Sequence, residues 1–402
     1  MQDHPVLGQV ALGYSPMIDK QRAVSGWRLT VFPETPGITP DGPSLLAALD
    51  AVWPAPADPK APARLALNLA GEDLLCSVMA AEPGRHRMIE VPAFMAADAR
   101  HQTALARLHA AGTPLILKGR PLSPLSAEVL GLFTHCLLAP DEDRRDIAPA
   151  TGSGRHVAAL QAGIHSTAAA DAAFQRGMVA VFGWPWEDPP AAGPARSGLP
   201  PDAKTVLDLI NGVEREDSVQ QLEPLLRRDP TLAFRLMRYL NSPAFGLPVE
   251  VTSFGHALML LGYQRLKRWL ALLLVSSAKG PNSQVVIQAS IRRGLLMEAL
   301  VMEQGDPEQR SEMFICGVFS LLPTLLQQPM DELLRNVPVP ERVQQALRGA
   351  GGPFGPWLDL VLAIEGESIF DIRERSAPLL MDTGAVSRAV LKALKGAGEL
   401  SA

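Results

Sequence analysis

A proline-rich stretch divides this chain into two parts with different residue patterns. Residues 186–201 read WEDPPAAGPARSGLPP. Proline fixes φ and lacks a backbone donor, so a stretch of this kind is unsuited to a helix or an inner strand. Strand-like and helix-like segments alternate before it, whereas helical patterns follow it. We therefore expect a first domain at residues 1–186, a Pro/Gly-rich linker at 187–198 and a second domain at 199–402.

Short apolar runs with turn residues around them fill the first part, spaced roughly 20 to 25 residues apart. Alanine- and leucine-rich stretches of helical length separate several of these runs. The alternation predicts parallel βα units with buried strands, and about seven units favour a closed (β/α)8-type barrel. An open doubly wound sheet gives the same local pattern. The predicted strands are Val10–Tyr14, Leu65–Leu69, Met88–Val91, Leu115–Leu117, Cys136–Leu138, Val157–Leu160 and Val179–Phe182, and the predicted helices are Ser44–Val52, Glu72–Ala81, Ala93–Ala111 and Thr167–Arg176.

The second part carries apolar residues at helical spacing and little strand-like alternation. Ser218 with Gln221 three residues later is typical of a capping box, and Asp229 before Pro230 is a favoured helix start. An all-α domain is therefore expected. The first predicted helix is Lys204–Glu214, and the two helix starts above follow it. Later predicted helices are Phe254–Leu261, Gln264–Ser276, Val285–Gln304, Ser311–Leu326, Met330–Arg335, Pro340–Gly349, Trp357–Gly366 and Ala385–Lys395.

The composition excludes several classes of protein. The formal net charge is -5, from 37 Lys and Arg against 42 Asp and Glu, and neither half is basic, so nucleic acid is not an expected partner. The longest apolar run, Trp269–Val275, is far shorter than the roughly 20 residues of a membrane span. Without a secretory signal the expected location is cytoplasmic. The three cysteines are too scattered for a disulfide framework or thiolate metal site.

The segment RRDPTLAFRLMRYLNSPAFGL and the following VTSFGHALMLLGYQRLKRWL resemble the HDOD domain, a helical relative of the HD phosphohydrolases found in bacterial signalling proteins. HD enzymes hold metals through several histidines and aspartates, but residues 191–402 contain a single histidine, His256. The resemblance places Arg293 at the first histidine position and Ser320-Leu321 at the His-Asp pair. We therefore expect no histidine-built metal centre in this part.

With that family in view, the first part resembles a degenerate EAL domain, the cyclic di-GMP phosphodiesterase barrel. An active EAL domain needs a cluster of carboxylates, an asparagine and a lysine, because two divalent cations must hold the phosphodiester and activate the attacking water. Asn68 and Glu90 match two of these positions, but the signature Glu-Ala-Leu stretch is Gly26–Thr30, without a carboxylate. Lys118-Gly119 replaces the paired aspartates, and Arg176 replaces the closing glutamine. The resemblance thus implies a barrel with vestigial positions and no metal or other cofactor.

Other polar residues are candidates for contacts with a partner of the helical domain. Asn241 and Ser242 precede a proline, and their side chains fit a fixed turn followed by the large apolar Phe245. Arg265 and Arg268 belong to a local basic cluster, which is commonly a solvated helix face and otherwise a surface for an anionic ligand or an acidic partner.

Loss of both metal sites leads to the expectation of a non-catalytic bacterial signal-transduction protein. Its domains would sense a ligand or dock other signalling proteins, in a system linked to cyclic di-GMP. The alternative is a receptor that binds cyclic di-GMP without hydrolysing it, with Lys118 and Arg176 contacting phosphate. An active phosphodiesterase is the less favoured third case.

Overall fold

The computed structural model of the chain describes residues 4–56, 58, 64–142, 157–186, 201–227, 254–278, 283–302 and 305–401. Two compact units are present. One, the barrel unit, combines Met1–Pro189 with Leu362–Leu391, and the other, the helical unit, combines Pro190–Val361 with Lys392–Ala402. The predicted linker at 187–198 lies outside the described residues. Residues 362–391, which the sequence pattern assigns to the helical domain, group with the barrel.

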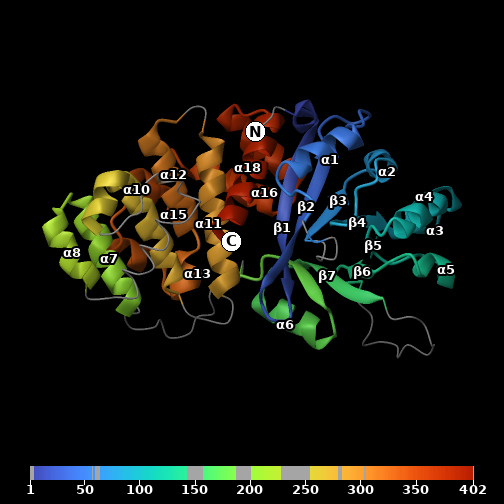
Figure 1. Cartoon of the computed structure of the whole chain (residues 1–402), viewed down its shortest axis with the longest axis horizontal. Coiled ribbons are helices and arrows are strands. Elements are labelled where there is room, and N and C mark those ends of the chain that lie inside the picture. The colour runs from blue at the N-terminus through green and yellow to red at the C-terminus, as the bar shows by residue number, and fades with distance from the viewer. Residues whose placement is uncertain are drawn as a thin grey trace. The chain divides into compact units, whose positions relative to one another are not determined.

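The barrel unit is built around a closed barrel of eight strands in sequence order (Figure 1). β1 is antiparallel to both of its neighbours, and the other neighbouring strands are parallel. Closure confirms the predicted barrel over the open sheet. The strands are β1 Val10–Asp19, β2 Val24–Pro33, β3 Leu65–Leu69, β4 Arg87–Pro92, β5 Leu115–Lys118, β6 His135–Leu138, β7 Ala158–Ile164 and β8 Ala180–Gly183.

Apolar side chains fill the barrel interior, and polar ones follow two residues later on three neighbouring strands. The buried cluster includes Ala66 of β3, Met88 of β4 and Ile116 of β5. Side chains in a strand alternate between the two faces, so the second residue after each of these lies on the same interior face. Those residues are Asn68, Glu90 and Lys118. The period of two therefore places a polar layer at the carboxyl ends of β3, β4 and β5.

Short helices connect the strands of the barrel unit: α1 Gly42–Asp50, α2 Glu72–Ala80, α3 Ala93–Ala97, α4 Ala99–Ala110, α5 Ala127–Leu130 and α6 Thr167–Gln175. The prediction of one helix over 93–111 is wrong at Asp98. This residue has extended backbone angles, and its carboxylate accepts a hydrogen bond from the Arg100 backbone N–H at the start of α4. Its preference for a helix cap over a helix interior separates α3 from α4.

Residues 362–391 pack against the barrel through hydrogen bonds to several strands. This segment holds the end of α16, α17 Ile369–Ser376 and the first part of α18 Thr383–Ser401. The buried Ser387 hydroxyl donates to the Val10 carbonyl at 2.7 Å, and the Trp184 indole N–H donates to the Glu365 carbonyl at 2.8 Å. In Figure 1 the red ribbon of α18 lies alongside blue β1. The segment is thus tied to the first strand and to the end of the last.

Every described element of the helical unit is a helix, as the sequence pattern predicts. One half of the predicted capping box forms, because the Ser218 backbone N–H donates to Gln221 Oε1 at 2.8 Å, while the Ser218 hydroxyl donates to the same oxygen at 2.9 Å. Gly262, with φ 69°, interrupts α10 between the two predicted helices. None of the described helices has the length and hydropathy that crossing a bilayer requires. The helices are α7 Pro201–Glu214, α8 Val219–Arg227, α10 Phe254–Ser276, α11 Ser283–Leu300, α12 Pro307–Phe319, α13 Leu322–Leu326, α14 Met330–Asn336, α15 Glu341–Leu347 and the start of α16 Gly355–Glu365.

Candidate functional site

The polar layer at the carboxyl end of the barrel is the first candidate site. Thr30 of β2 pairs in register with Asn68 of β3, and Glu90 and Lys118 follow on β4 and β5. Active sites of parallel βα barrels lie at this end, because the strands deliver side chains from several elements to one mouth. The structure therefore brings together three of the four predicted barrel positions, namely Asn68, Glu90 and Lys118.

Arg28 of β2 forms the centre of this mouth and binds Glu90 with two parallel hydrogen bonds. Its Nε donates to Glu90 Oε1 at 2.6 Å, and its Nη2 donates to Glu90 Oε2 at 2.8 Å. The Glu90 side chain is fully buried, and that of Arg28 is 11% exposed. Burial by itself lowers the pKa of the Arg28 guanidinium, but the charges and hydrogen bonds of Glu90 and Glu367 outweigh burial and raise this pKa. Arg28 is therefore a permanent buried cation.

A second carboxylate, that of Glu367, reaches the same guanidinium from the segment between α16 and α17. Glu367 Oε2 accepts from Arg28 Nη1 at 2.6 Å and from the Thr30 hydroxyl at 2.7 Å. The sequence patterns do not predict this residue as part of the site, because 339 positions separate it from Arg28. The local sequence Gly-Glu-Ser marks a break between helices and carries no sign of a distant contact.

Asn68 and Lys118 extend the network along the strands. The Asn68 amide Nδ2 donates to Thr30 Oγ1 at 3.0 Å, and Asn68 Oδ1 accepts from Lys118 Nζ at 2.6 Å. Lys118 Nζ also lies 3.9 Å from Glu90 Oε2. Burial lowers the pKa of the Lys118 amine, and the charge of Arg28 adds to this effect, whereas the carboxylate of Glu90 opposes it. Two cations and two carboxylates thus share one connected network.

The remaining vestigial position, Arg176, follows α6. Its Nη2 donates to Gln161 Oε1 of β7 at 3.0 Å. The Arg176 side chain therefore contacts β7, whereas the network described above links side chains of β2, β3, β4 and β5.

The helical unit joins the two positions at which the sequence resemblance places metal ligands. Arg293 of α11 is buried, and its Nη1 donates to the hydroxyl of Ser320 at 3.2 Å. A cation and a hydroxyl therefore meet at the two positions that the sequence resemblance assigns to metal-binding side chains. Within the described residues, no three His, Cys, Asp or Glu side chains gather as a metal-binding group.

Of the predicted interaction residues, Arg268 and Arg265 fall within the described part of the chain. Arg268 of α10 makes a bidentate pair with Glu298, with Nη2 to Oε2 at 2.8 Å, and its guanidinium carbon lies 4.0 Å from the Phe314 ring centroid. Arg265 is exposed on the same helix. The predicted residues Asn241, Ser242 and Phe245 lie outside the described residues.

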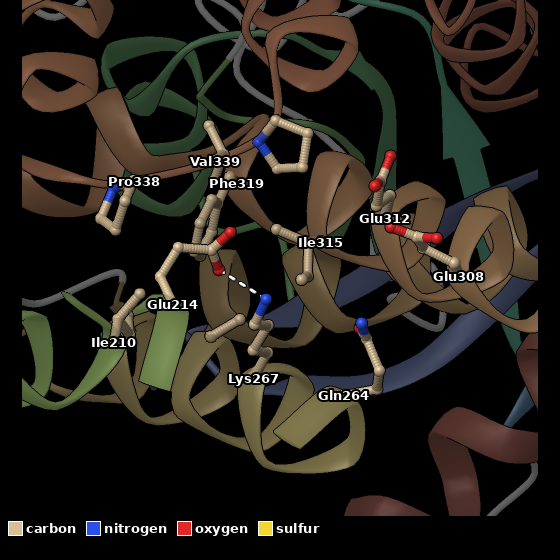
Figure 2. Close-up of a pocket in the computed structure, with 12 residues that line it drawn as sticks. Ile210, Glu214, Gln264, Lys267, Glu308, Glu312, Ile315, Phe319, Pro338 and Val339 are labelled. Carbon is tan, nitrogen blue, oxygen red and sulfur yellow. Dashed lines mark ion pairs between the residues drawn. The ribbon is translucent and has the colours of Figure 1, made fainter. Parts of the chain in front are cut away.

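A pocket in the helical unit is the second candidate site, with an empty volume of about 510 Å3. Ile315 and Phe319 of α12 contribute to its apolar wall. Figure 2 shows the Lys267 amine pointing toward the Glu214 carboxylate, with Glu308 and Glu312 beyond Ile315 in this view. The Lys267–Glu214 distance is 2.7 Å. The residues around the pocket come from α7, α10, α12 and the stretch before α15: Ile210, Glu214, Gln264, Lys267, Ala271, Glu308, Glu312, Ile315, Phe319, Pro338, Val339 and Pro340.

Comparison with protein families and curated sequences identifies proteins that are similar to part of this chain. The HDOD domain model matches residues 199–329. A protein of Bacillus subtilis, uncharacterized protein YuxH, is 32% identical over 165 residues, which are 40% of this chain and 40% of that protein. The cyclic di-GMP phosphodiesterase CdgJ of Vibrio cholerae is 24% identical over 181 residues, 45% of this chain and 42% of CdgJ. Each match thus covers less than half of the relative.

Solved structures with partial likeness include the PaMucR phosphodiesterase in complex with c-di-GMP, at 18% identity and a TM-score of 0.31 over 44% of this chain and 94% of that one. The EAL enzyme Bd1971 in a cGMP-bound form has 11% identity and a TM-score of 0.30 over 44% of this chain and 60% of that one. The HDOD domain model thus matches part of the helical unit, at residues 199–329, and a closed eight-stranded barrel precedes this stretch in the chain.

Proposed function

We propose that this chain is a non-catalytic signal-transduction protein in a cyclic di-GMP-linked system, with both units acting as ligand-sensing or protein-docking modules. The observation that carries the proposal is the bidentate binding of Glu90 by Arg28 inside the barrel mouth. The carboxylate that matches a metal ligand of the EAL family is taken by a buried cation of the protein itself.

A pair of divalent cations, which the EAL resemblance implies, does not fit these side chains. Hard cations need several oxygen ligands whose charge balances their own. Both Glu90 oxygens accept from Arg28, and Asn68 Oδ1 accepts from Lys118 Nζ. A metal ion would replace these bonds while standing beside two positive side chains. Repulsion from Arg28 and Lys118 therefore supports a site that does not recruit metal.

The relatives support the signalling context. An HDOD domain occupies residues 199–329, and CdgJ is named a cyclic di-GMP phosphodiesterase. That name also favours the rival function, an active phosphodiesterase. The two functions differ in one requirement, because hydrolysis needs the metal-binding carboxylates that Arg28 and Lys118 replace or neutralise in this chain.

Incubation of the purified full chain with cyclic di-GMP and Mg²⁺ or Mn²⁺ tests the proposal. We expect no hydrolysis above a mock preparation, and the Arg265→Gln variant, altered at an exposed helix position, serves as a matched control. Turnover by the wild type that disappears in Glu90→Gln would overturn the proposal, because it would place a working carboxylate in the mouth.

Calorimetric titration of cyclic di-GMP into the same protein separates docking from reception. Saturable binding without turnover, lost in Lys118→Met, would favour the receptor alternative, in which the half-buried amine at the mouth contacts phosphate. Absence of binding, with and without Mg²⁺, would favour a docking module.

A further inference from the structure

We propose that Glu367 is an internal ligand of the barrel mouth: its carboxylate occupies an oxyanion site formed by Arg28 and Thr30 and thereby closes this site to external anions. The inference concerns the contact between residues 362–391 and the barrel, and it does not depend on cyclic di-GMP or on the absence of catalysis. Release of Glu367 would open a site for a carboxylate or a phosphate oxygen.

Charge balance is the first support. Arg28 divides its guanidinium between two acceptors, with Nε and Nη2 on Glu90 and Nη1 on Glu367. Lys118 adds a second positive group to the same network. Without Glu367, the buried Arg28 would keep only Glu90 as a carboxylate partner, and its Nη1 would lose its acceptor, which is unfavourable for a buried charge. The charge of Arg28 therefore favours an anion at the position that Glu367 occupies.

The donor arrangement is the second support. The Arg28 Nη1 and the Thr30 hydroxyl both donate to a single oxygen, Glu367 Oε2, at 2.6 Å and 2.7 Å. Asn68 Nδ2 in turn donates to Thr30 Oγ1, which leaves the hydroxyl hydrogen for Glu367. Hydrogen bonds of this kind, to an ionised acceptor, are stronger than those between neutral groups. The two donors are thus oriented for an oxyanion whichever molecule supplies it.

The backbone is shaped for this contact. Glu367 has φ 52°, in the left-handed region that non-glycine residues seldom adopt. On the facing strand, Gly13 of β1 leaves room for the segment, because a Cβ on Gly13 would lie 2.9 Å from Glu367 Cα and 3.0 Å from the Ile364 carbonyl oxygen. An alanine in place of Gly13 would push the segment that holds Glu367 away from β1 without changing the charge of any residue.

Only one of the two oxygens of the Glu367 carboxylate accepts hydrogen bonds from Arg28 and Thr30, as expected of a ligand that can be displaced. Glu367 Oε1 is buried and has no hydrogen-bond partner among the described residues. A buried acceptor without a donor loses its hydration and gains nothing in return. Together with the unfavourable backbone angle, this cost offsets part of the attraction to Arg28.

Chemical rescue tests the site directly. In Glu367→Ala the two donors lose their acceptor, and we expect added acetate or inorganic phosphate, at constant ionic strength, to raise the melting temperature of the barrel unit by about 2–4 °C. The wild type and Glu374→Ala, a matched change at an exposed position of the same segment, should shift by less than half of that. Larger rescue by acetate would indicate a carboxylate site, and larger rescue by phosphate a phosphoryl site. Equal shifts in all three proteins, or none in Glu367→Ala, would overturn the proposal.

A steric variant keeps the proposal testable if Glu367→Ala does not fold. We expect Gly13→Ala to speed amide hydrogen exchange at least tenfold in peptides covering 362–376. Gly8→Ala is the matched control, because a Cβ there meets no described atom within 4 Å. Unchanged exchange in Gly13→Ala, or equal acceleration in Gly8→Ala, would contradict the close approach of Glu367 to β1.

Discussion

Two arginine–glutamate pairs, one in each unit, are both bidentate but differ in the guanidinium nitrogens that they use and in their surroundings. Arg28 binds Glu90 in the barrel mouth, and Arg268 binds Glu298 between two helices of the helical unit. Each guanidinium also lies near a phenylalanine ring. The exposed fractions of the two side chains are 11% and 0% for Arg28 and Glu90, but 29% and 16% for Arg268 and Glu298.

The two pairs differ in burial and in the number of additional partners, and we expect these differences to determine how much each pair contributes to stability. Water competes with the Arg268–Glu298 pair and screens it, so its net contribution to stability is small. The Arg28–Glu90 pair is desolvated, so removing either partner leaves the other charge buried without compensation. Arg28 also holds Glu367, which joins residues 362–391 to the barrel.

Substitution of each arginine by methionine should produce the largest effect. We expect Arg28→Met to lower the free energy of unfolding of the barrel unit by about 3–5 kcal/mol, because Glu90 and Glu367 lose their shared cation. Arg268→Met should lower that of the helical unit by at most about 1 kcal/mol. Urea unfolding, with hydrogen exchange assigned to each unit, measures both values. Equal losses would abolish the distinction drawn between the two pairs.

Neutralising Arg28 together with both of its carboxylate partners should recover much of the first loss. In the triple variant Arg28→Met, Glu90→Gln, Glu367→Gln no unpaired carboxylate remains, and a buried pair replaced as a group is commonly much less destabilising than a broken one. We expect the triple variant to regain at least half of the stability that Arg28→Met loses in the same urea experiment. A loss as large as that of the single variant would show that shape, and not charge, dominates the mouth.

A smaller effect is expected from salt, which should weaken the coupling energy of the Arg268–Glu298 pair but not that of the Arg28–Glu90 pair. A double-mutant cycle on Arg268 and Glu298 should give a coupling energy of about 0.5–1 kcal/mol that falls toward zero at high salt, where the Debye length is about 3 Å. The cycle on Arg28 and Glu90 should change little, because ions do not reach a buried pair. A salt-insensitive Arg268–Glu298 coupling would contradict the role assigned to exposure.

The smallest expected effect is the change in the free energy of unfolding with pH that arises from titration of the Lys118 amine. Burial lowers the pKa of its amine below the ordinary value of 10.5, so the folded protein releases this proton at a lower pH than the unfolded chain. Between the two values the unfolded state binds more protons, and stability rises with pH. We expect wild type to gain stability relative to Lys118→Met as pH increases toward 10.5 in urea unfolding. An opposite slope would indicate that Glu90 raises this pKa more than burial lowers it.

Local sequence determined most elements of both units. The strand predicted at Leu65–Leu69 has those bounds in the structure, because a short apolar run between turn residues has no competing local conformation. The side-chain period of two also brought Asn68 and Glu90 to one interior face. The two predicted helices on either side of Gly262 form, since glycine readily adopts the φ of 69° found there.

The residues that complete the barrel mouth depend on contacts between distant parts of the chain. Barrel closure, the grouping of residues 362–391 with the first unit and the contact of Glu367 with Arg28 all involve residues far apart in the chain. Short α17 follows a left-handed residue and had no apolar period long enough to predict it. Hydrophobic period and capping report on neighbours within a few residues, whereas a contact across 339 positions depends on how packed elements meet in space. The sequence therefore placed Asn68 and Glu90 on one face of the barrel, and the fold supplied Arg28 and Glu367, which complete the mouth.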